Sequence, residues 1–130
     1  MKKILMLFAV FAFATVSVNA QSSEDTMKDR ATKMHEVIKT KDNAKFEKFV
    51  NEHYSSRLIK EYEMSFHTGM LERLSGNFSN SKIISQTIKD NKLSMVVETT
   101  RDKERVSIEI SFDEKEDYKI NGMNVEAGDR

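Results

Sequence analysis

Hydrophobic residues in the first part of the chain, after residue 20, recur at helical spacing. From Thr26 onward, apolar side chains return every three or four residues, which predicts a helix with one buried stripe. We expect Asp25 or Thr26 to be its N-cap and residues 21–25 to form a frayed polar leader. The stripe consists of Met27, Ala31, Met34 and Ile38.

Two further helices are expected before residue 77. Asp42 can cap the second, whose apolar face carries Phe46, Phe49, Val50 and His53. Ser55-Ser56 offers a cap for a long third helix that reaches Ser75 and stops at Gly76. Gly69 weakens this segment by roughly 1 kcal/mol relative to Ala, so a kink or break there stays open. The stripe of the third helix is Leu58, Tyr62, Phe66, Met70 and Leu74.

Beyond residue 80 the apolar period changes from about 3.6 to 2, which indicates strands. Charged or polar turns are expected at 89–92, 101–104 and 113–117. A slip from even to odd numbering at Asn121-Gly122 predicts a bulge, where Gly tolerates unusual backbone angles. The expected faces are Ile84, Gln86 and Ile88; Leu93, Met95, Val97 and Thr99; Val106, Ile108, Ile110 and Phe112; and Tyr118, Ile120, Met123 and Val125.

Helices followed by hairpin-linked strands predict an α+β fold. Short turns force neighbouring strands to be antiparallel, and the amphipathic helices are the available cover for one apolar sheet face. We therefore expect N-terminal helices packed on a curved four-stranded antiparallel sheet.

Residues 1–20 have the three-part pattern of a secretory signal peptide. Lys2-Lys3 is a positive head, residues 4–14 are an apolar run, and Val18-Asn19-Ala20 is a small-residue cleavage site. This apolar run is too short to span a bilayer. The pattern predicts a periplasmic or secreted protein, with residues 21–130 as one mature domain and no membrane association after cleavage.

Composition narrows the function classes. The chain has no Cys, which excludes disulfides, thiolate metal sites and a cysteine nucleophile. Removing residues 1–20 leaves 19 basic and 21 acidic side chains, a net charge of −2, which argues against nucleic-acid binding. The three histidines, His35, His53 and His67, lack metal-ligand spacing, and we find no cofactor-binding motif, so neither a metal nor a cofactor is expected.

Several stretches of the mature chain resemble the nuclear-transport-factor-2-like superfamily, whose cone-shaped fold is shared with cystatin-like domains. They are Lys41-Asp42-Asn43, Phe46-Glu47-Lys48-Phe49, Glu52-His53-Tyr54-Ser55, residues 71–78 and residues 118–126. Within the superfamily, the chain is similar to small exported bacterial domains found alone or attached to serine-hydrolase (beta-lactamase-like) domains. The resemblance implies a cone but no single activity, because relatives include isomerases, dehydratases, polyketide cyclases and pure binding or dimerisation modules.

Enzymes on this cone place a few polar side chains in an apolar cavity, typically a base and a Tyr donor. The counterparts here would be His53, Tyr54, Tyr62 and His67, with Glu98 and Arg101 at a strand end. The alternative is that both tyrosines lie at the core boundary with wet hydroxyls. A ligand pocket would draw on Tyr62, Phe66, Met70, Met95 and Phe112. Met34, Met64 and Met123 could line it as well, although methionines more often fill gaps in a thin core.

We expect an exported non-catalytic domain that binds a small apolar molecule or a protein partner, itself included. A homodimer would use the outward sheet face, where Ser107, Glu109 and Ser111 are small or singly charged. The alternative is a small cofactor-free isomerase or cyclase that uses polar residues in the cone cavity. An inhibitor-like module with a cystatin-type edge is a third option, but the chain lacks an obvious Gly-rich inhibitory loop.

Overall fold

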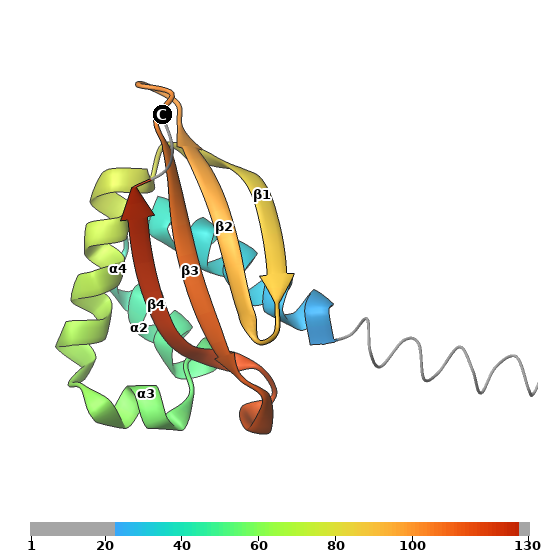
Figure 1. Ribbon diagram of the computed structural model, residues 1–130. Helices are drawn as coiled ribbons and strands as arrows, with labels where there is room; N and C mark the ends of the chain where they lie inside the picture. The colour runs from blue at the N-terminus through green and yellow to red at the C-terminus, as the bar shows by residue number, and fades with distance from the viewer. Residues whose placement is uncertain (1–22, 128–130) are drawn as a thin grey trace, which may run out of the picture.

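The computed structural model describes residues 23–127, in which four helices pack against a four-stranded antiparallel sheet (Figure 1). The expected signal peptide, residues 1–20, lies outside the described residues. The first helix spans residues 23–40. It is followed by α2 (Asn43–His53), α3 (Ser56–Glu61), α4 (Met64–Phe78), β1 (Ser81–Lys89), β2 (Lys92–Thr99), β3 (Arg105–Asp113), a 3-10 turn η1 (Glu114–Glu116) and β4 (Lys119–Ala127).

The sheet has the strand order β1-β2-β3-β4, with every neighbour antiparallel. Its inner face carries the alternating apolar rows that the sequence predicts on β2 and β3. The first helix and α2 lie behind the sheet in Figure 1, with α4 beside the β4 edge, so one face is covered while the described residues leave the other uncovered. This arrangement confirms the predicted α+β fold, and the sheet stays open because β1 and β4 do not pair. The buried rows are Leu93, Met95, Val97, Val106, Ile108, Ile110 and Phe112.

The first helix buries the predicted stripe of Met27, Ala31, Met34 and Ile38. Its start, however, is earlier than expected. Residues 23–26 are already helical, so Asp25 and Thr26 are not N-caps and no polar leader reaches Asp25. A helix can begin with a polar turn before its apolar stripe. The start predicted from the stripe is therefore later than the one observed.

The start of α2 is correctly predicted, because Asp42 Oδ1 accepts a hydrogen bond from the Ala44 amide at 3.0 Å. The long third helix is wrong. The chain leaves helical geometry at Tyr62 and Glu63, both of which are extended, and resumes as α4. Gly69 and Gly76 both lie inside α4, so neither breaks or ends a helix.

The break rotates α4 relative to α3, so the stripe of residues four apart is not one buried face. Tyr62 and Phe66 are 44% and 47% exposed, whereas Leu74 is buried. The buried face of α4 is His67, Thr68, Leu71, Leu74, Ser75 and Phe78.

Two bulges set which residues of the edge strands face the helices. On β4 the register slips at Asn121, as predicted, so that Met123 packs on the core. The expected reason for Gly122 is wrong, because its φ is not positive. A Cβ there would lie 2.8 Å from Ser111 Oγ, so a larger residue at position 122 would require the Ser111 hydroxyl to rotate away. On β1 a second, unexpected slip leaves Ile84 exposed and turns Ile83 toward the core in its place.

Candidate functional site

A pocket of about 330 Å³ lies where α3, α4 and the middle of β4 meet. In Figure 1, α3 crosses below the sheet and α4 rises beside the β4 edge, so the pocket lies at the lower end of this edge. The lining is mostly aromatic, aliphatic and thioether, with a few polar groups, which is the composition of a small-molecule site. The lining residues are Tyr54, Arg57, Leu58, Glu61, Tyr62, Phe66, His67, Met70, Asn121, Gly122 and Met123.

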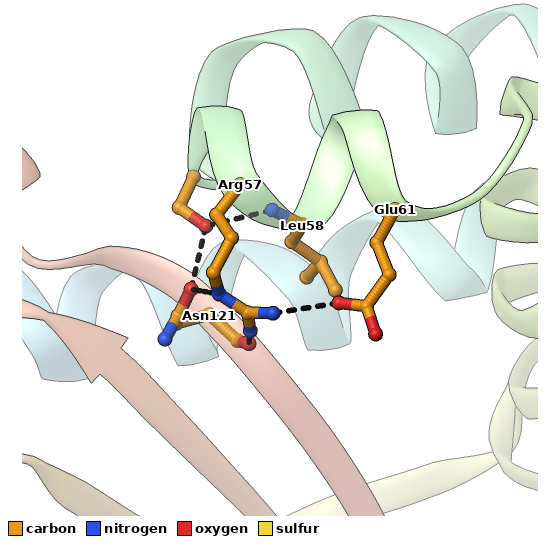
Figure 2. Close-up of polar contacts among 5 residues, drawn as sticks. Arg57, Leu58, Glu61 and Asn121 are labelled. Atoms are coloured by element: carbon orange, nitrogen blue, oxygen red, sulfur yellow. Dashed lines mark hydrogen bonds and ion pairs between the residues drawn. The ribbon is translucent and has the colours of Figure 1, made fainter.

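The bulge residue Asn121 holds α3 in place at one side of the pocket. Ser55 caps α3 by accepting from the Leu58 amide at 3.2 Å, and its own hydroxyl donates to Asn121 Oδ1 at 2.8 Å. Arg57 Nε donates to the same oxygen at 3.0 Å (Figure 2). Because α3 has no fully buried residue and only Leu58 and Ile59 pack partly on the core, these hydrogen bonds contribute strongly to its position.

The charged groups at the rim of the pocket are already paired. Arg57 Nη2 donates to the Asn121 carbonyl at 2.7 Å, and Nη1 donates to Glu61 Oε2 at 2.6 Å. The start of α3 is also tied to η1, because the Ser56 amide donates to Glu116 Oε2 at 3.0 Å. The rim is therefore a fixed polar frame, and neither Arg57 nor Glu61 presents an unpaired charge.

Tyr62 and Phe66 form an exposed aromatic stack at the pocket. Their ring centroids are 4.3 Å apart and their planes are inclined by 22°. Tyr62 belongs to the extended joint between α3 and α4, and Glu63, the N-cap of α4, makes no side-chain capping bond. The stack thus stands at the least restrained helix junction of the site.

Tyr54 and His67 form the inner wall of the pocket. Both are nearly fully buried, and their rings meet edge to face with centroids 5.4 Å apart. Burial raises the pKa of the Tyr54 hydroxyl far above its usual range, so this group stays protonated. His67 also meets Tyr62 and Phe66 edge to face, each at 6.0 Å, which encloses the imidazole in three rings.

The His67 side chain is 3% exposed, and its Nε2 has no hydrogen-bond partner. A buried polar atom without a partner costs about 1–3 kcal/mol, so the position carries a standing penalty. Such an atom at the wall of an apolar pocket is suited to receive a hydrogen bond from a ligand, or to donate one.

Of the expected site residues, the fold brings Tyr54, Tyr62, Phe66, His67 and Met70 to one pocket. Met95 and Phe112 lie elsewhere, in the buried core under the helices. Glu98 lies near a strand end, where its Oε2 accepts from Arg105 Nε at 3.0 Å. Arg101 lines a separate hollow at the turn between β2 and β3.

His53, the remaining candidate, is part of a structural cluster away from the pocket. Arg30 donates from Nη1 to His53 Nδ1 and from Nη2 to the Asp117 carbonyl, each at 2.9 Å. Burial first, and then the Arg30 charge, lowers the pKa of His53, which keeps the ring neutral. The cluster joins the first helix, α2 and the turn before β4. His53 Nδ1 is one of its hydrogen-bond acceptors, so that nitrogen is already paired.

Sequence reasoning missed Arg57, Leu58, Glu61, Asn121 and Gly122 as pocket residues, and it considered Met123 both as a pocket residue and as a core filler. The spacing of Arg57 and Glu61 by four is a visible helix pair, and the bulge at Asn121 is predicted. Neither signal says that the two meet, because their contact depends on how α3 crosses β4.

Wider hollows occur on the molecule, but their chemistry is less specific. One of about 620 Å³ lies beside the β1–β2 hairpin and includes Lys89, Asp90, Lys92 and Glu109. Of the expected site residues it includes Phe112 alone, whereas the pocket at His67 brings five of them together. We therefore take the pocket at His67 as the candidate site.

Within residues 23–127, no cluster of three or more His, Asp or Glu side chains could hold a metal ion. Over the same span, no helix combines the length and the apolar character that crossing a membrane requires. Comparison with known proteins gives no matching family model, curated protein or solved structure.

Proposed function

We propose that this protein is an exported, non-catalytic domain that binds a small apolar ligand in the pocket between α3, α4 and β4. The observation that carries the proposal is the stacked pair Tyr62 and Phe66, left half exposed beside an apolar hollow. Burying two aromatic rings is worth several kcal/mol, so a ligand that covers them gains affinity from area alone.

Support for a pocket, as opposed to a flat patch, comes from its walls. Leu58 is anchored through α3, and Met123 is turned inward by the bulge. Met70 supplies a flexible thioether that adapts to a ligand's outline and makes favourable contacts with aromatic rings.

Native mass spectrometry of the purified protein, followed by calorimetric titration with any co-purified compound, tests this function. Met70→Glu places a charge on the pocket wall and should reduce affinity at least about tenfold, because the charge must be desolvated when ligand binds. Val96→Glu is the control, since Val96 is similarly half buried but lies away from the pocket lining. An equal effect of both variants, or binding that neither variant changes, would contradict the pocket.

Export is proposed from the pattern of residues 1–20. Expression of the full chain in a bacterial host should release a product that begins near Gln21, found in the periplasm or the medium. Intact-mass measurement of each fraction checks this, and an uncleaved cytoplasmic product would contradict it.

The resemblance to the nuclear-transport-factor-2-like cone remains a proposal as well. Helices on one face of an open, four-stranded antiparallel sheet are compatible with it. A protein partner, or a second copy seated on the outer sheet face, is the other form of the binding proposal. Light scattering at high concentration tests self-association, and a strict monomer would exclude it.

A small cofactor-free isomerase or cyclase is the second candidate, favoured by the contact of Tyr54 with His67 in an apolar pocket. The protonated Tyr54 hydroxyl is a suitable hydrogen-bond donor to a substrate carbonyl, and His67 is a suitable base. Against it, the lining carboxylate, Glu61, is paired with Arg57. Chromatography of the co-purified compound after incubation with the protein would reveal turnover, and Tyr54→Phe should then abolish it.

A further inference from the structure

The pocket at His67 carries a preference for one class of ligand, and this inference rests on the binding function proposed above. Its starting point is the unpartnered Nε2, which is held on the wall of the pocket in a side chain that is 3% exposed. In the structure as it stands this atom has almost no accessible surface, because the rings of Tyr54, Tyr62 and Phe66 lie against the imidazole, so neither water nor a ligand reaches it until the Tyr62–Phe66 stack parts.

The rings around His67 define the shape of the missing partner. Tyr62 and Phe66 are stacked upon one another and meet the imidazole edge to face. A flat ring that enters beside them gains the same stacked or edge-to-face contacts, and the thioethers of Met70 and Met123 can lie against its face.

The charges of the pocket define the ligand's polarity. Arg57 uses three of its five N–H donors on Glu61 and Asn121, and its charge is balanced by Glu61, so a carboxylate or phosphate group gains less from it than from an unpaired guanidinium. The volume of about 330 Å³ is near the lower end of ligand sites, which span roughly 300–1,000 Å³, so a single-ring compound fits best.

We propose that the pocket selects small phenol-class aromatic compounds, whose hydroxyl group becomes the hydrogen-bond partner of His67 Nε2. A phenol hydroxyl both donates and accepts, so it satisfies Nε2 in either neutral form of the imidazole. Entry requires the Tyr62–Phe66 stack to part, and the extended joint at Tyr62 and Glu63 gives the stack that freedom without unpacking the buried face of α4.

Calorimetric titration of the mature protein with three matched probes tests the proposal. The probes are 4-ethylphenol, ethylbenzene, which lacks the hydroxyl, and 4-ethylcyclohexanol, which lacks the aromatic ring. We expect 4-ethylphenol to bind about tenfold or more tightly than either analogue, the size of one buried hydrogen bond or of lost ring contacts. In His67→Phe, the preference for 4-ethylphenol over ethylbenzene should fall to near onefold while ethylbenzene still binds.

Nitrogen NMR of the histidine side chains provides a second readout. It is measured on protein that keeps His67, so it does not require His67→Phe to fold. The His67 Nε2 resonance should shift on saturation with 4-ethylphenol and stay nearly unchanged with ethylbenzene. His35→Gln and His53→Asn assign the three imidazoles by elimination.

The outcomes separate this inference from the function on which it rests. If 4-ethylphenol and ethylbenzene bind equally, or 4-ethylcyclohexanol matches 4-ethylphenol, the phenol preference is overturned while apolar binding stands. If 4-ethylphenol is preferred without a His67 shift, the hydroxyl binds elsewhere and the role of His67 is overturned. If none of the probes binds, the pocket is not a small-molecule site, and both proposals fail.

Discussion

The region around His35 and the region around His67 solve the same problem in opposite ways. Both imidazoles are buried, at 5% and 3% exposure. His35 lies where the first helix meets β1, and its Nε2 is 3.0 Å from Ser81 Oγ, which itself donates to the Phe78 carbonyl at 2.6 Å. His67 has no such partner for Nε2. Polar groups in cores are almost always satisfied, and among residues 23–127 the buried side-chain atoms without a partner are Arg30 Nε and His67 Nε2. Arg30 is bonded through its two other nitrogens, whereas His67 is the one that lines the candidate pocket.

The residues around the two histidines also differ in how completely they are packed and hydrogen-bonded. Around His35 the contacts are closed, and Ser75 adds a hydrogen bond from α4 to the Ile38 carbonyl of the first helix. Around His67 the rings of Tyr62 and Phe66 are half exposed and stand over a hollow. The first region joins helices to the sheet without a hollow, whereas in the second α3, α4 and the β4 edge meet around a pocket, with Asn121 bonded to α3 at one side.

Removing the hydrogen-bond partner of His35 should have the largest effect on stability. Ser81→Ala removes the acceptor of His35 and the donor to the Phe78 carbonyl, and should lower the free energy of unfolding by about 1–3 kcal/mol. Urea denaturation measures this. Ser107→Ala is the control on the outer sheet face, where a change within about 0.5 kcal/mol is expected. Equal losses in the two variants would show that the His35 contact is not special.

Replacing His67, whose Nε2 has no partner, should reduce stability much less. His67→Phe replaces a buried, unpartnered nitrogen with an apolar ring, so the free energy of unfolding should stay within about 1 kcal/mol of its original value or increase. His35→Phe, the matched variant, loses a satisfied hydrogen bond and should be the less stable of the two. The reverse order, measured by the same denaturation, would mean that His67 Nε2 is bonded in solution.

The pH dependence of stability sharpens the comparison further, with the smallest expected effect. Burial is the main cause that lowers the pKa of His35 and His53 below 6.5, with Lys39 and Arg30 respectively adding repulsion. The unfolded chain therefore takes up protons at higher pH than the native protein does, and stability should fall as the pH drops from about 7 to about 5. Above the unfolded value both forms are neutral, and this contribution is constant.

Two isosteric variants check the source of that slope. In His53→Asn an amide oxygen can accept from Arg30 where Nδ1 does, and in His35→Gln an amide nitrogen can donate to Ser81. Each change removes a titrating group while it keeps the hydrogen bond, so the slope should become shallower. An unchanged slope in the double variant would assign it to other groups.

The elements that sequence predicts best are those whose apolar residues share one uninterrupted face. The stripe from Met27 to Ile38 and the row from Val106 to Phe112 are buried as expected, because each needs only one neighbour layer to cover it. The Asp42 cap and the slip at Asn121 are local signals that also hold.

The break at Tyr62 and Glu63 was not predictable in the same way. No Gly or Pro stands there, and the spacing of four continues straight across it. The direction of α3 is set by tertiary contacts: Asn121 and Glu116, some 60 residues later in the chain, bind the start of a helix whose Leu58 and Ile59 are only partly buried against the core. The candidate site depends on that break, so its aromatic and His members could be named from the sequence while their meeting place could not.

Methionine and phenylalanine carry no signal that separates a pocket from a core. Met70 lines the pocket, while Met95, expected beside it, is fully buried under the helices. Their chemistry is identical, and only the distance of α4 from the β4 edge decides which of them a ligand would meet.

The distribution of tyrosines gives the molecule a built-in optical reporter. The chain has three tyrosines and no tryptophan. Tyr54 and Tyr62 both line the pocket, and Tyr118 is the residue directly before β4. Near-ultraviolet emission and circular dichroism will therefore arise mainly from the walls of the pocket, so that a change there can be followed in the purified, unlabelled protein.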